Sequence, residues 1–425
     1  MSKKILIRGA RQLLTLRGSS AARRGKSLSD LAMIPDGAIL VKDGRIETIG
    51  PGRRLENLAE SKDALVIEAD GCVVMPGFVD PHTHLVSGPP RVNEFEMRIL
   101  GASLEQSGVL HDGLHAQVRN VRSLPARRLE LQARNMLLQF VRHGTTTLEA
   151  KTGYGLDETG EMKCVRVLED LQNCPITVIP TWFVARALPP EFVDNADGYL
   201  RFLSKEMLHR IAKRKTVSYV DADPAACGFT LNQTMQFLRA ARLAGLSPRL
   251  HAGLHQADSN VELAVALRAE SVSHCNYITD HQIGHLCDSS TVAIFLPGLA
   301  YHLCLDRLPP ARRMIESGVA VALASGYDPL LSPSCNMQMV VSLACKHLNM
   351  SAAEAIHAAT FNAAAAAGCS RESGSLEAGK SADILILAIP DYREIPYHFG
   401  MNLVSTVIRR GEIVHQETAP EWRVA

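Results

Sequence analysis

The fold is decided by the stretch Cys72-Val73-Val74-Met75-Pro76-Gly77-Phe78-Val79-Asp80-Pro81-His82-Thr83-His84-Leu85, an apolar run that ends in two histidines. Side chains alternate along a strand with a period of two, so His82 and His84 point to the same side. Both imidazoles can therefore reach one ion, and histidine is a common ligand of zinc-like metals. Two exposed loop histidines would give the same pattern, so the metal hypothesis depends on histidines later in the chain.

Short β-branched runs alternate with longer helix-like segments between about residue 77 and residue 326. The candidate strands are residues 78–82, 145–149, 176–180, 217–221, 248–251, 271–274, 292–296 and 319–323. Several of the segments between them have apolar residues at a spacing near 3.6. This alternation predicts an α/β fold, a (β/α)8 TIM barrel with its chemistry at the C-terminal ends of the strands.

The two flanks of the chain have a different pattern. Strand-like runs occur at residues 5–7, 38–41, 46–49 and 64–67, and again at 382–387 and 404–411. We therefore expect one small β-sandwich domain made of residues 1–72 and 376–425, with the barrel, residues 73–375, inserted between them. The alanine-rich segment 352–367 is predicted to be a single helix.

Composition excludes several classes of partner. The 425 residues are 46% hydrophobic and carry a net charge of +1, so we expect neither a nucleic-acid nor a membrane partner. The ten cysteines contain no C-x-x-C pair, which favours a reducing compartment. No run reaches eighteen apolar residues and the N-terminus is too polar for a signal, so we expect a cytoplasmic protein.

Four histidines fall at or just past the ends of predicted barrel strands. They are His82 and His84 after the first strand, His251 in the fifth and His274 in the sixth. Any one of them has the ordinary alternative of a hydrogen-bonded core histidine. Together they predict a metal site, because three neutral imidazoles with an open position can hold a zinc-like ion and lower the pKa of a water toward ~7.

Several longer motifs also have a recognisable pattern. They are Pro76–Leu85, Arg91–Glu96, His143–Thr146, Lys151–Leu156, Leu188–Phe192, Pro309–Arg312 and Gly374–Lys380. With these motifs the chain resembles the imidazolonepropionase family of the amidohydrolase superfamily over nearly its whole length. That family opens the ring of 4-imidazolone-5-propionate by hydrolysis.

The resemblance implies roles for particular residues. His82, His84 and His251 would be ligands of one divalent metal ion, zinc or iron, and His274 would assist the attacking water or the substrate carbonyl. Arg91 and Tyr154 match positions that grip the substrate, and a guanidinium can pair bidentately with a propionate-like carboxylate. A surface ion pair is the ordinary alternative for Arg91. The resemblance also leaves a homodimer open.

The sequence departs from the family at several polar positions. Gly326 stands where the eighth strand of the family ends in an aspartate that binds the metal and accepts a proton. Arg186 replaces a substrate-contacting histidine, and Leu254 replaces an acidic or amide residue, with His255 beside it. The fourth strand, which ends at residues 221–226, lacks a glutamate of the family.

These departures leave three functions open. The first is a divergent metal-dependent hydrolase that opens a cyclic amide or another C–N bond of a small anionic substrate, imidazolone-like or hydantoin-like. Its proton acceptors would be His274, His255 or Asp328, and Arg186 would join Arg91 at the substrate. The second is an altered or inactive protein that binds a small molecule or catalyses non-hydrolytic chemistry. The third is an orthodox imidazolonepropionase.

Overall fold

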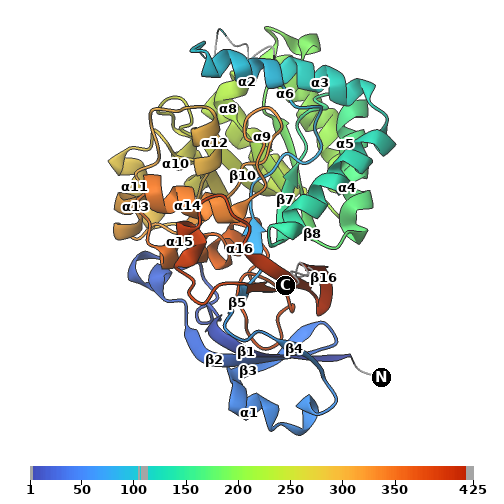
Figure 1. Ribbon diagram of the computed structural model, residues 1–425. Coiled ribbons are helices and arrows are strands. Elements are labelled where there is room, and N and C mark those ends of the chain that lie inside the picture. Colours follow the sequence, from blue (N-terminus) through green and yellow to red (C-terminus); the bar gives the residue numbers. More distant parts are fainter. Residues whose placement is uncertain (1–2, 104–105, 107–112, 418–425) are drawn as a thin grey trace.

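A computed structural model describes residues 3–103, 106 and 113–417 and shows two parts (Figure 1). One part is a nearly closed barrel of parallel strands surrounded by helices. The other is a separate mixed sheet that contains strands from both ends of the chain. The predicted (β/α)8 barrel with a β domain built from the flanks is confirmed.

The barrel strands follow one another in sequence order around the sheet, and every pair is parallel. They are β6 (Phe78–Asp80), β7 (Thr145–Lys151), β8 (Thr177–Ala185), β9 (Tyr219–Ala222), β10 (Ser247–Ala252), β11 (Ser271–His274), β12 (Val292–Phe295) and β13 (Val321–Leu323). Each overlaps a predicted strand, because β-branched runs buried on both faces are typical of parallel sheets.

Side chains connect the two strands at the ends of this order, β6 and β13. Ser325 lies two residues beyond β13, and its backbone N–H and hydroxyl both donate to the carboxylate of Asp80 in β6. The backbone N–H of His84 also donates to the carbonyl of Tyr327 at 2.7 Å. The loops after the first and last barrel strands are thereby fixed against each other.

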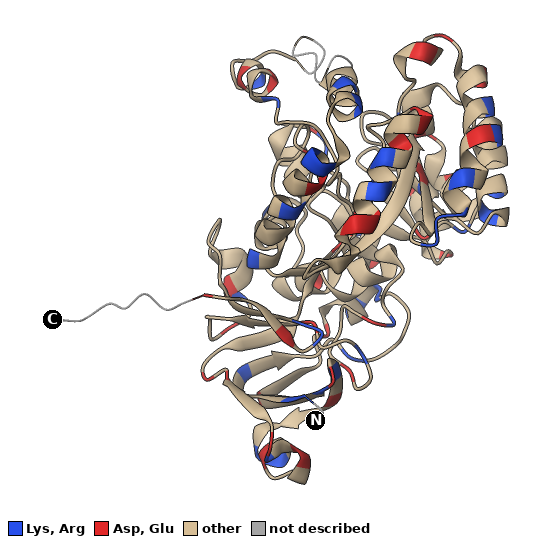
Figure 2. Ribbon diagram, turned by 90° about the vertical axis from the view of Figure 1, so that its right-hand side faces the viewer, with Lys and Arg blue, Asp and Glu red and all other residues tan. Residues whose placement is uncertain are grey.

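Helices lie on the outside of the barrel and over the mouth at its C-terminal end (Figure 1). They are α2 (Val92–Ile99), α3 (Leu114–Ser123), α4 (Ala126–Arg142), α5 (Glu158–Asp170), α6 (Ala196–Phe202), α7 (Leu208–Ala212), α8 (Pro224–Cys227), α9 (Leu231–Leu243), α10 (Asn260–Ala266), α11 (Asp280–Cys287), α12 (Pro297–His302), α13 (Ala311–Glu316), α14 (Met337–His347), α15 (Ala352–Ala358) and α16 (Phe361–Ala367). Basic and acidic residues alternate along the outer helices (Figure 2). No helix in the described ranges is long and apolar enough to cross a membrane.

The second part is one mixed sheet with the order β16-β15-β14-β5-β1-β2-β3, and β4 pairs with β1. Its strands are β1 (Lys4–Leu14), β2 (Met33–Lys42), β3 (Arg45–Pro51), β4 (Leu65–Glu68), β5 (Val73–Pro76), β14 (Ile384–Leu387), β15 (Val404–Arg409) and β16 (Glu412–Gln416). The short helix α1 (Gly52–Glu56) packs against β1, β2 and β3, whereas α17 (Glu394–Tyr397), which lies between β14 and β15 in the sequence, packs against α14 of the barrel. The β2–β3 hairpin turns at Asp43 and Gly44, which both have positive φ.

The chain passes from the sheet to the barrel within a few residues. β5 pairs with β1 and β14 in the sheet, and β6 begins the barrel two residues after β5 ends. A Cβ on Gly77, between them, would lie 2.1 Å from the hydroxyl oxygen of Thr146, so only glycine fits this position. The domain limits 1–72, 73–375 and 376–425 stay predictions, and the sheet itself extends to Pro76.

The segment 352–367 forms two helices instead of the single helix predicted. α15 and α16 are separated by Ala359 and Thr360, and Thr360 has a non-helical backbone (φ −128°, ψ −91°). Its hydroxyl donates to the carbonyl of Ile356 at 2.6 Å, and Asn362 bonds the backbone of Arg23 and Val321. The long-range bonds of Asn362 outweigh the helix propensity of alanine.

His357 in α15 gives the fold a pH dependence. Its side chain is fully buried (0% exposed), and burial, with a contribution from Arg23, lowers its pKa from 6.5 to about 4. Between about pH 6.5 and about pH 4, His357 is protonated in the unfolded chain but not in the folded chain. Its contribution to the free energy of unfolding is therefore fully present above about pH 6.5 and is lost as the pH falls.

We expect the free energy of unfolding to fall by about 2 kcal/mol more for the wild type than for His357→Gln between about pH 7.5 and about pH 5. Urea unfolding of both proteins at the two pH values measures the difference. An equal loss in the two proteins would contradict the assignment.

Candidate functional site

A cavity of about 530 Å³ opens at the C-terminal ends of the barrel strands. Its polar and charged lining residues are His82, His84, His115, Arg186, Asp194, Asp223, His251, His255, His274 and Asp328. Most of them lie at strand ends or in the loops that directly follow, where barrel enzymes hold their functional groups. Phe183 and several leucines supply apolar walls.

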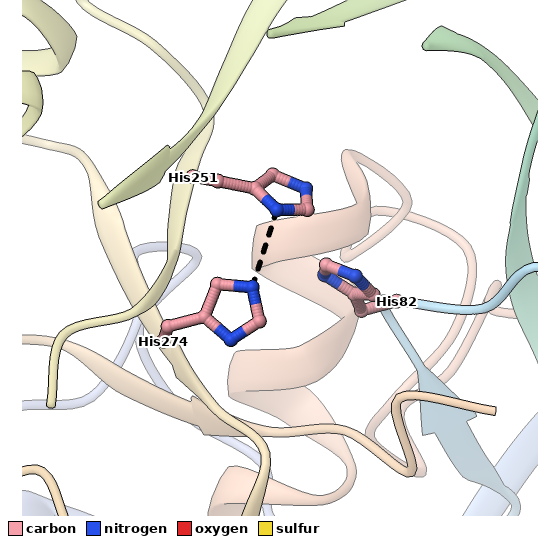
Figure 3. Close-up of side chains that lie close together, drawn as sticks. All are labelled: His82, His251 and His274. Carbon is pink, nitrogen blue, oxygen red and sulfur yellow. Dashed lines mark hydrogen bonds between the residues drawn. The ribbon is translucent and has the colours of Figure 1, made fainter. Parts of the chain in front are cut away.

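Three of the predicted histidines come together in this cavity. His82 follows β6, His251 lies in β10 and His274 is the last residue of β11, and one ring nitrogen of each lies within 4.8 Å of the others (Figure 3). The Nε2 of His274 is 3.1 Å from the Nδ1 of His251. His274 and the next residue, Cys275, have φ values of 80° and 61°, an uncommon backbone for residues other than glycine.

Neighbouring side chains orient two of these rings. The Nδ1 of His82 is 2.9 Å from the hydroxyl of Ser273, and the Nε2 of His251 is 3.2 Å from Asp221 Oδ2. Hydrogen bonds of this kind fix the tautomer of a histidine and the direction of its other nitrogen.

The three rings meet the chemical requirements of a metal site. All three residues are buried, and burial, followed by nearby positive groups, lowers the pKa of His82 and of His274 well below 6.5. The imidazoles of His82 and His274 are therefore neutral at physiological pH, which is the form that binds a metal. Zinc or iron fits this set of three nitrogens.

His84 is not one of these three donors, although its ring centroid is 5.5 Å from that of His82. Its Nδ1 is 2.8 Å from Nη1 of Arg186, and its ring lies beside those of Tyr154 and Phe183. Burial and then the charge of Arg186 lower the pKa of His84 well below its ordinary value. The predicted ligands His82 and His251 thus meet His274, whereas His84 meets the predicted substrate residues.

Arg186, Tyr154 and Asp328 form one buried cluster. Arg186 Nη2 donates to the Tyr154 hydroxyl at 2.9 Å and to Asp328 Oδ2 at 3.1 Å, and that hydroxyl donates to the same carboxylate oxygen at 2.5 Å. Asp328 Oδ1 accepts from the backbone N–H groups of Leu330 and Leu331. Both oxygens of Asp328, a predicted proton acceptor, are therefore already engaged.

Arg91 lies at the start of α2, outside the residues that line the cavity. Its Nε donates to Glu94 Oε1 at 2.6 Å, so the local ion pair weighed as an alternative is present. His255, predicted as a proton acceptor, does line the cavity, and burial lowers its pKa.

An aspartate at Gly326, which the resemblance implies, would need an unfavourable backbone conformation and a shift of the Leu296 side chain. The φ of Gly326 is +63°, and a Cβ added there would lie 2.7 Å from Cδ2 of Leu296. Leu296 follows β12 and packs in an apolar cluster with Leu299 and Leu330. Hydrocarbon thus occupies space next to the position that a carboxylate would need.

A fully buried charge network lies beside the three histidines. Lys151 Nζ is 2.7 Å from Glu149 Oε1 and 2.6 Å from Asp221 Oδ2, and Arg249 also donates to Glu149. Burial alone raises the pKa of Asp221, but Lys151 and then His251 outweigh it and hold this pKa below its usual range. Asp221 is therefore an anion between Lys151 and His251.

Comparison with known proteins identifies the family. The model of the amidohydrolase family matches residues 73–414. The chain belongs to the amidohydrolase family.

This amidohydrolase is similar to imidazolonepropionases over nearly its full length, which confirms the resemblance in the motifs. It is 38% identical over 419 residues to the imidazolonepropionase of Geobacillus kaustophilus, covering 97% of this chain and 98% of the relative. It is also 38% identical over 416 residues to that of Symbiobacterium thermophilum, covering 97% of each.

Solved structures show the same fold at low identity. A triazine hydrolase variant superposes with a TM-score of 0.72 at 16% identity, covering 97% of this amidohydrolase and 95% of the other chain. A zinc-containing adenosine deaminase of Xanthomonas campestris gives a TM-score of 0.66 at 15% identity, covering 97% and 92%. At these identities the likeness establishes the fold alone.

Three further residues lie at the site of this amidohydrolase, although the sequence did not indicate a role for them. Asp223 follows β9 and lines the cavity, while Lys151 and Asp221 lie in the buried network. Asp223 follows the signal used for the histidines, a polar residue directly after a strand. The network has no such signal, because its members lie within strands and meet only when the barrel forms.

Replacing Lys151 tests the buried network. In Lys151→Met two buried carboxylates lose their shared cation, and removing one member of a buried ionic group typically costs about 3–5 kcal/mol. We expect a loss of this size in the free energy of urea unfolding. The matched control is Arg210→Met, which removes the exposed Arg210–Glu158 pair and should cost less than about 1 kcal/mol. Equal effects of the two variants would contradict the prediction.

Proposed function

We propose that this amidohydrolase uses one divalent metal ion to hydrolyse a C–N bond in a small cyclic amide of the imidazolone type. The observation that carries the proposal is the convergence of three buried imidazoles, their nitrogens within 4.8 Å of one another, at the wall of the cavity. The relatives described above are named imidazolonepropionase, which favours imidazolonepropionate as the substrate over a hydantoin-like ring.

His82, His251 and His274 would hold the ion. When bound, such an ion polarises a carbonyl group and lowers the pKa of a water molecule. Ser273 and Asp221 hold the rings of His82 and His251 in position through their second nitrogens. Phe183 stacks on His251 with ring centroids 4.6 Å apart and covers one side of this group.

Asp223 and His255 are the candidates for proton transfer. Both line the cavity, and burial raises the pKa of Asp223 and lowers that of His255. Each shift favours the neutral form of its group. The shift of Asp223 also brings its pKa closer to pH 7, and a general base works best when its pKa lies near the working pH. Water adds to the amide carbon, the acceptor takes its proton, and the ring nitrogen receives a proton as the C–N bond breaks.

The charges around the cavity bear on the anionic substrate predicted from the sequence. Arg186 lines the cavity, and the carboxylate of Asp328 balances its charge. Arg91 is paired with Glu94, but its side chain remains 28% exposed. A substrate carboxylate would have to replace Glu94 at this guanidinium. Action in the cytoplasm and a homodimeric state stay predictions.

A second candidate function is binding or non-hydrolytic chemistry in the same cavity. The observation that favours it is Gly326 with Leu296 beside it. Glycine supplies neither the fourth ligand nor the proton acceptor that the resemblance implies, and a side chain there would have to displace Leu296. General acid–base catalysis contributes about 10² to 10⁴ in rate. If neither Asp223 nor His255 takes over the role of the missing proton acceptor, the protein would bind its ligand without hydrolysing it.

Metal analysis and ring-opening assays test the proposed function. We expect the purified protein to contain close to one zinc or iron per chain and to open the imidazolonepropionate ring. His82→Ala and His251→Ala should lose both the metal and at least about 100-fold in kcat/KM, because each removes a ligand. Elemental analysis and ultraviolet assays measure the two effects.

His281→Ala is the matched control for these variants, because His281 is an exposed histidine on α11 that does not line the cavity. It should retain the metal and the rate. A wild-type protein without metal that turns over no imidazolone or hydantoin would favour the second candidate. Unchanged turnover in His82→Ala would refute the assigned site.

Gly326→Asp should not restore an ordinary family site. A side chain at φ +63° costs about 1–2 kcal/mol, and its overlap with Leu296 adds about 1–3 kcal/mol. We expect Gly326→Asp and Gly326→Ala to unfold at similarly reduced urea concentrations, since both costs arise at the Cβ. Adding Leu296→Ala should relieve only the overlap. Wild-type stability of Gly326→Asp would contradict this account.

A further inference from the structure

The hydrogen bond between His84 and Arg186 decides the protonation of the His84 ring. Arg186 Nη1 lies 2.8 Å from His84 Nδ1. A guanidinium has only donors and keeps its charge in proteins, so Nδ1 must accept with its lone pair. A neutral ring in this bond carries its proton on Nε2. His84 is then a hydrogen-bond donor at Nε2, and its other nitrogen is occupied.

Arg186 cannot easily leave this bond, because its neighbours hold it. Its second terminal nitrogen bonds Tyr154 and Asp328, and its Cζ lies 4.2 Å from the centre of the Tyr154 ring. Asp328 is in turn held by two backbone N–H groups. The side chain of Arg186 is only 9% exposed, so competing water is scarce.

We infer that Arg186 removes His84 from the metal-ligand set and makes it a hydrogen-bond donor to the substrate. The inference rests on the proposed function, since it assigns the ion to His82, His251 and His274. A lone pair bound by a guanidinium is not free for a metal ion. Arg186 is thus a positioning residue that acts through His84.

The chemistry of the donor indicates what it recognises. His84 lines the cavity, and among the described residues none accepts a hydrogen bond from its Nε2. A substrate that presents a carbonyl or carboxylate oxygen near Phe183 would satisfy this N–H. A cyclic amide with an exocyclic oxygen on a planar ring has this chemistry, and the donor would select its orientation.

Zinc binding separates the two arrangements of ligands. We expect His274→Ala to weaken zinc affinity at least about 100-fold in competition with a chelating indicator, and His84→Ala to change it less than about threefold. The control is His281→Ala, with unchanged affinity. A loss in His84→Ala as large as that in His274→Ala would overturn the inference, because His84 would then be a ligand.

Rescue by glutamine tests the donor role. The amide oxygen of glutamine accepts from Arg186 and its NH₂ group donates, so His84→Gln keeps both bonds. With imidazolonepropionate we expect His84→Ala to lower kcat/KM about 10- to 100-fold and His84→Gln to recover at least about tenfold of it. Absence of any recovery, at unchanged zinc content, would refute the donor role.

The tautomer can be measured without metal or substrate. Long-range ¹H–¹⁵N spectra of protein labelled in histidine, with His84→Ala for assignment, should show Nδ1 unprotonated and Nε2 protonated. Arg186→Met should abolish this preference, and Arg186→Lys, which keeps a charged donor, should retain it. A protonated Nδ1 in the wild type would overturn the inference. If the wild type does not bind zinc, the proposed function is refuted. The spectrum would still show which ring nitrogen of His84 carries the proton, so the two failures can be told apart.

Discussion

The buried ionic group inside the barrel is the interaction on which the site depends. Glu149 and Lys151 come from β7, Asp221 from β9 and Arg249 from β10, and each is at most 2% exposed. Charges buried this deeply are tolerable only when they are paired and hydrogen-bonded, so the group requires these strands in one register. Asp221 also fixes the orientation of His251, because the same carboxylate oxygen contacts both Lys151 and the His251 ring.

The parallel barrel explains why much of the fold and part of the site could be predicted from the sequence. Buried β-branched runs have a clear pattern, and their C-terminal ends meet at one mouth, so four histidines were expected there, with His82, His84 and His251 as the ligands that the resemblance implies. Which three of four histidines converge could not be predicted, because it depends on side-chain direction. The position of His84 is set by Arg186, which comes from a different strand.

Tertiary contacts account for the other differences. Alanine propensity predicts one helix over residues 352–367. The segment is divided where the carbonyl of Ala359 accepts from the backbone N–H of Val79 and where Asn362 bonds the backbone of Arg23 and Val321. At Gly326 the sequence shows only that a side chain is missing. The structure adds that a Cβ at this position would lie 2.7 Å from Cδ2 of Leu296, which packs in an apolar cluster.

The departures that the resemblance implies would also change the charge balance of the cavity. An ion held by three neutral imidazoles keeps more of its positive charge than one with a carboxylate ligand, because the nearby anion Asp221 contacts it only through His251. Arg186 adds no net charge, since Asp328 balances it. The excess positive charge would therefore sit at the ion itself, where it attracts an anionic substrate and strengthens the polarisation of its carbonyl. Under the proposed function, an anionic cyclic amide would suit this cavity even though both candidate arginines already have carboxylate partners.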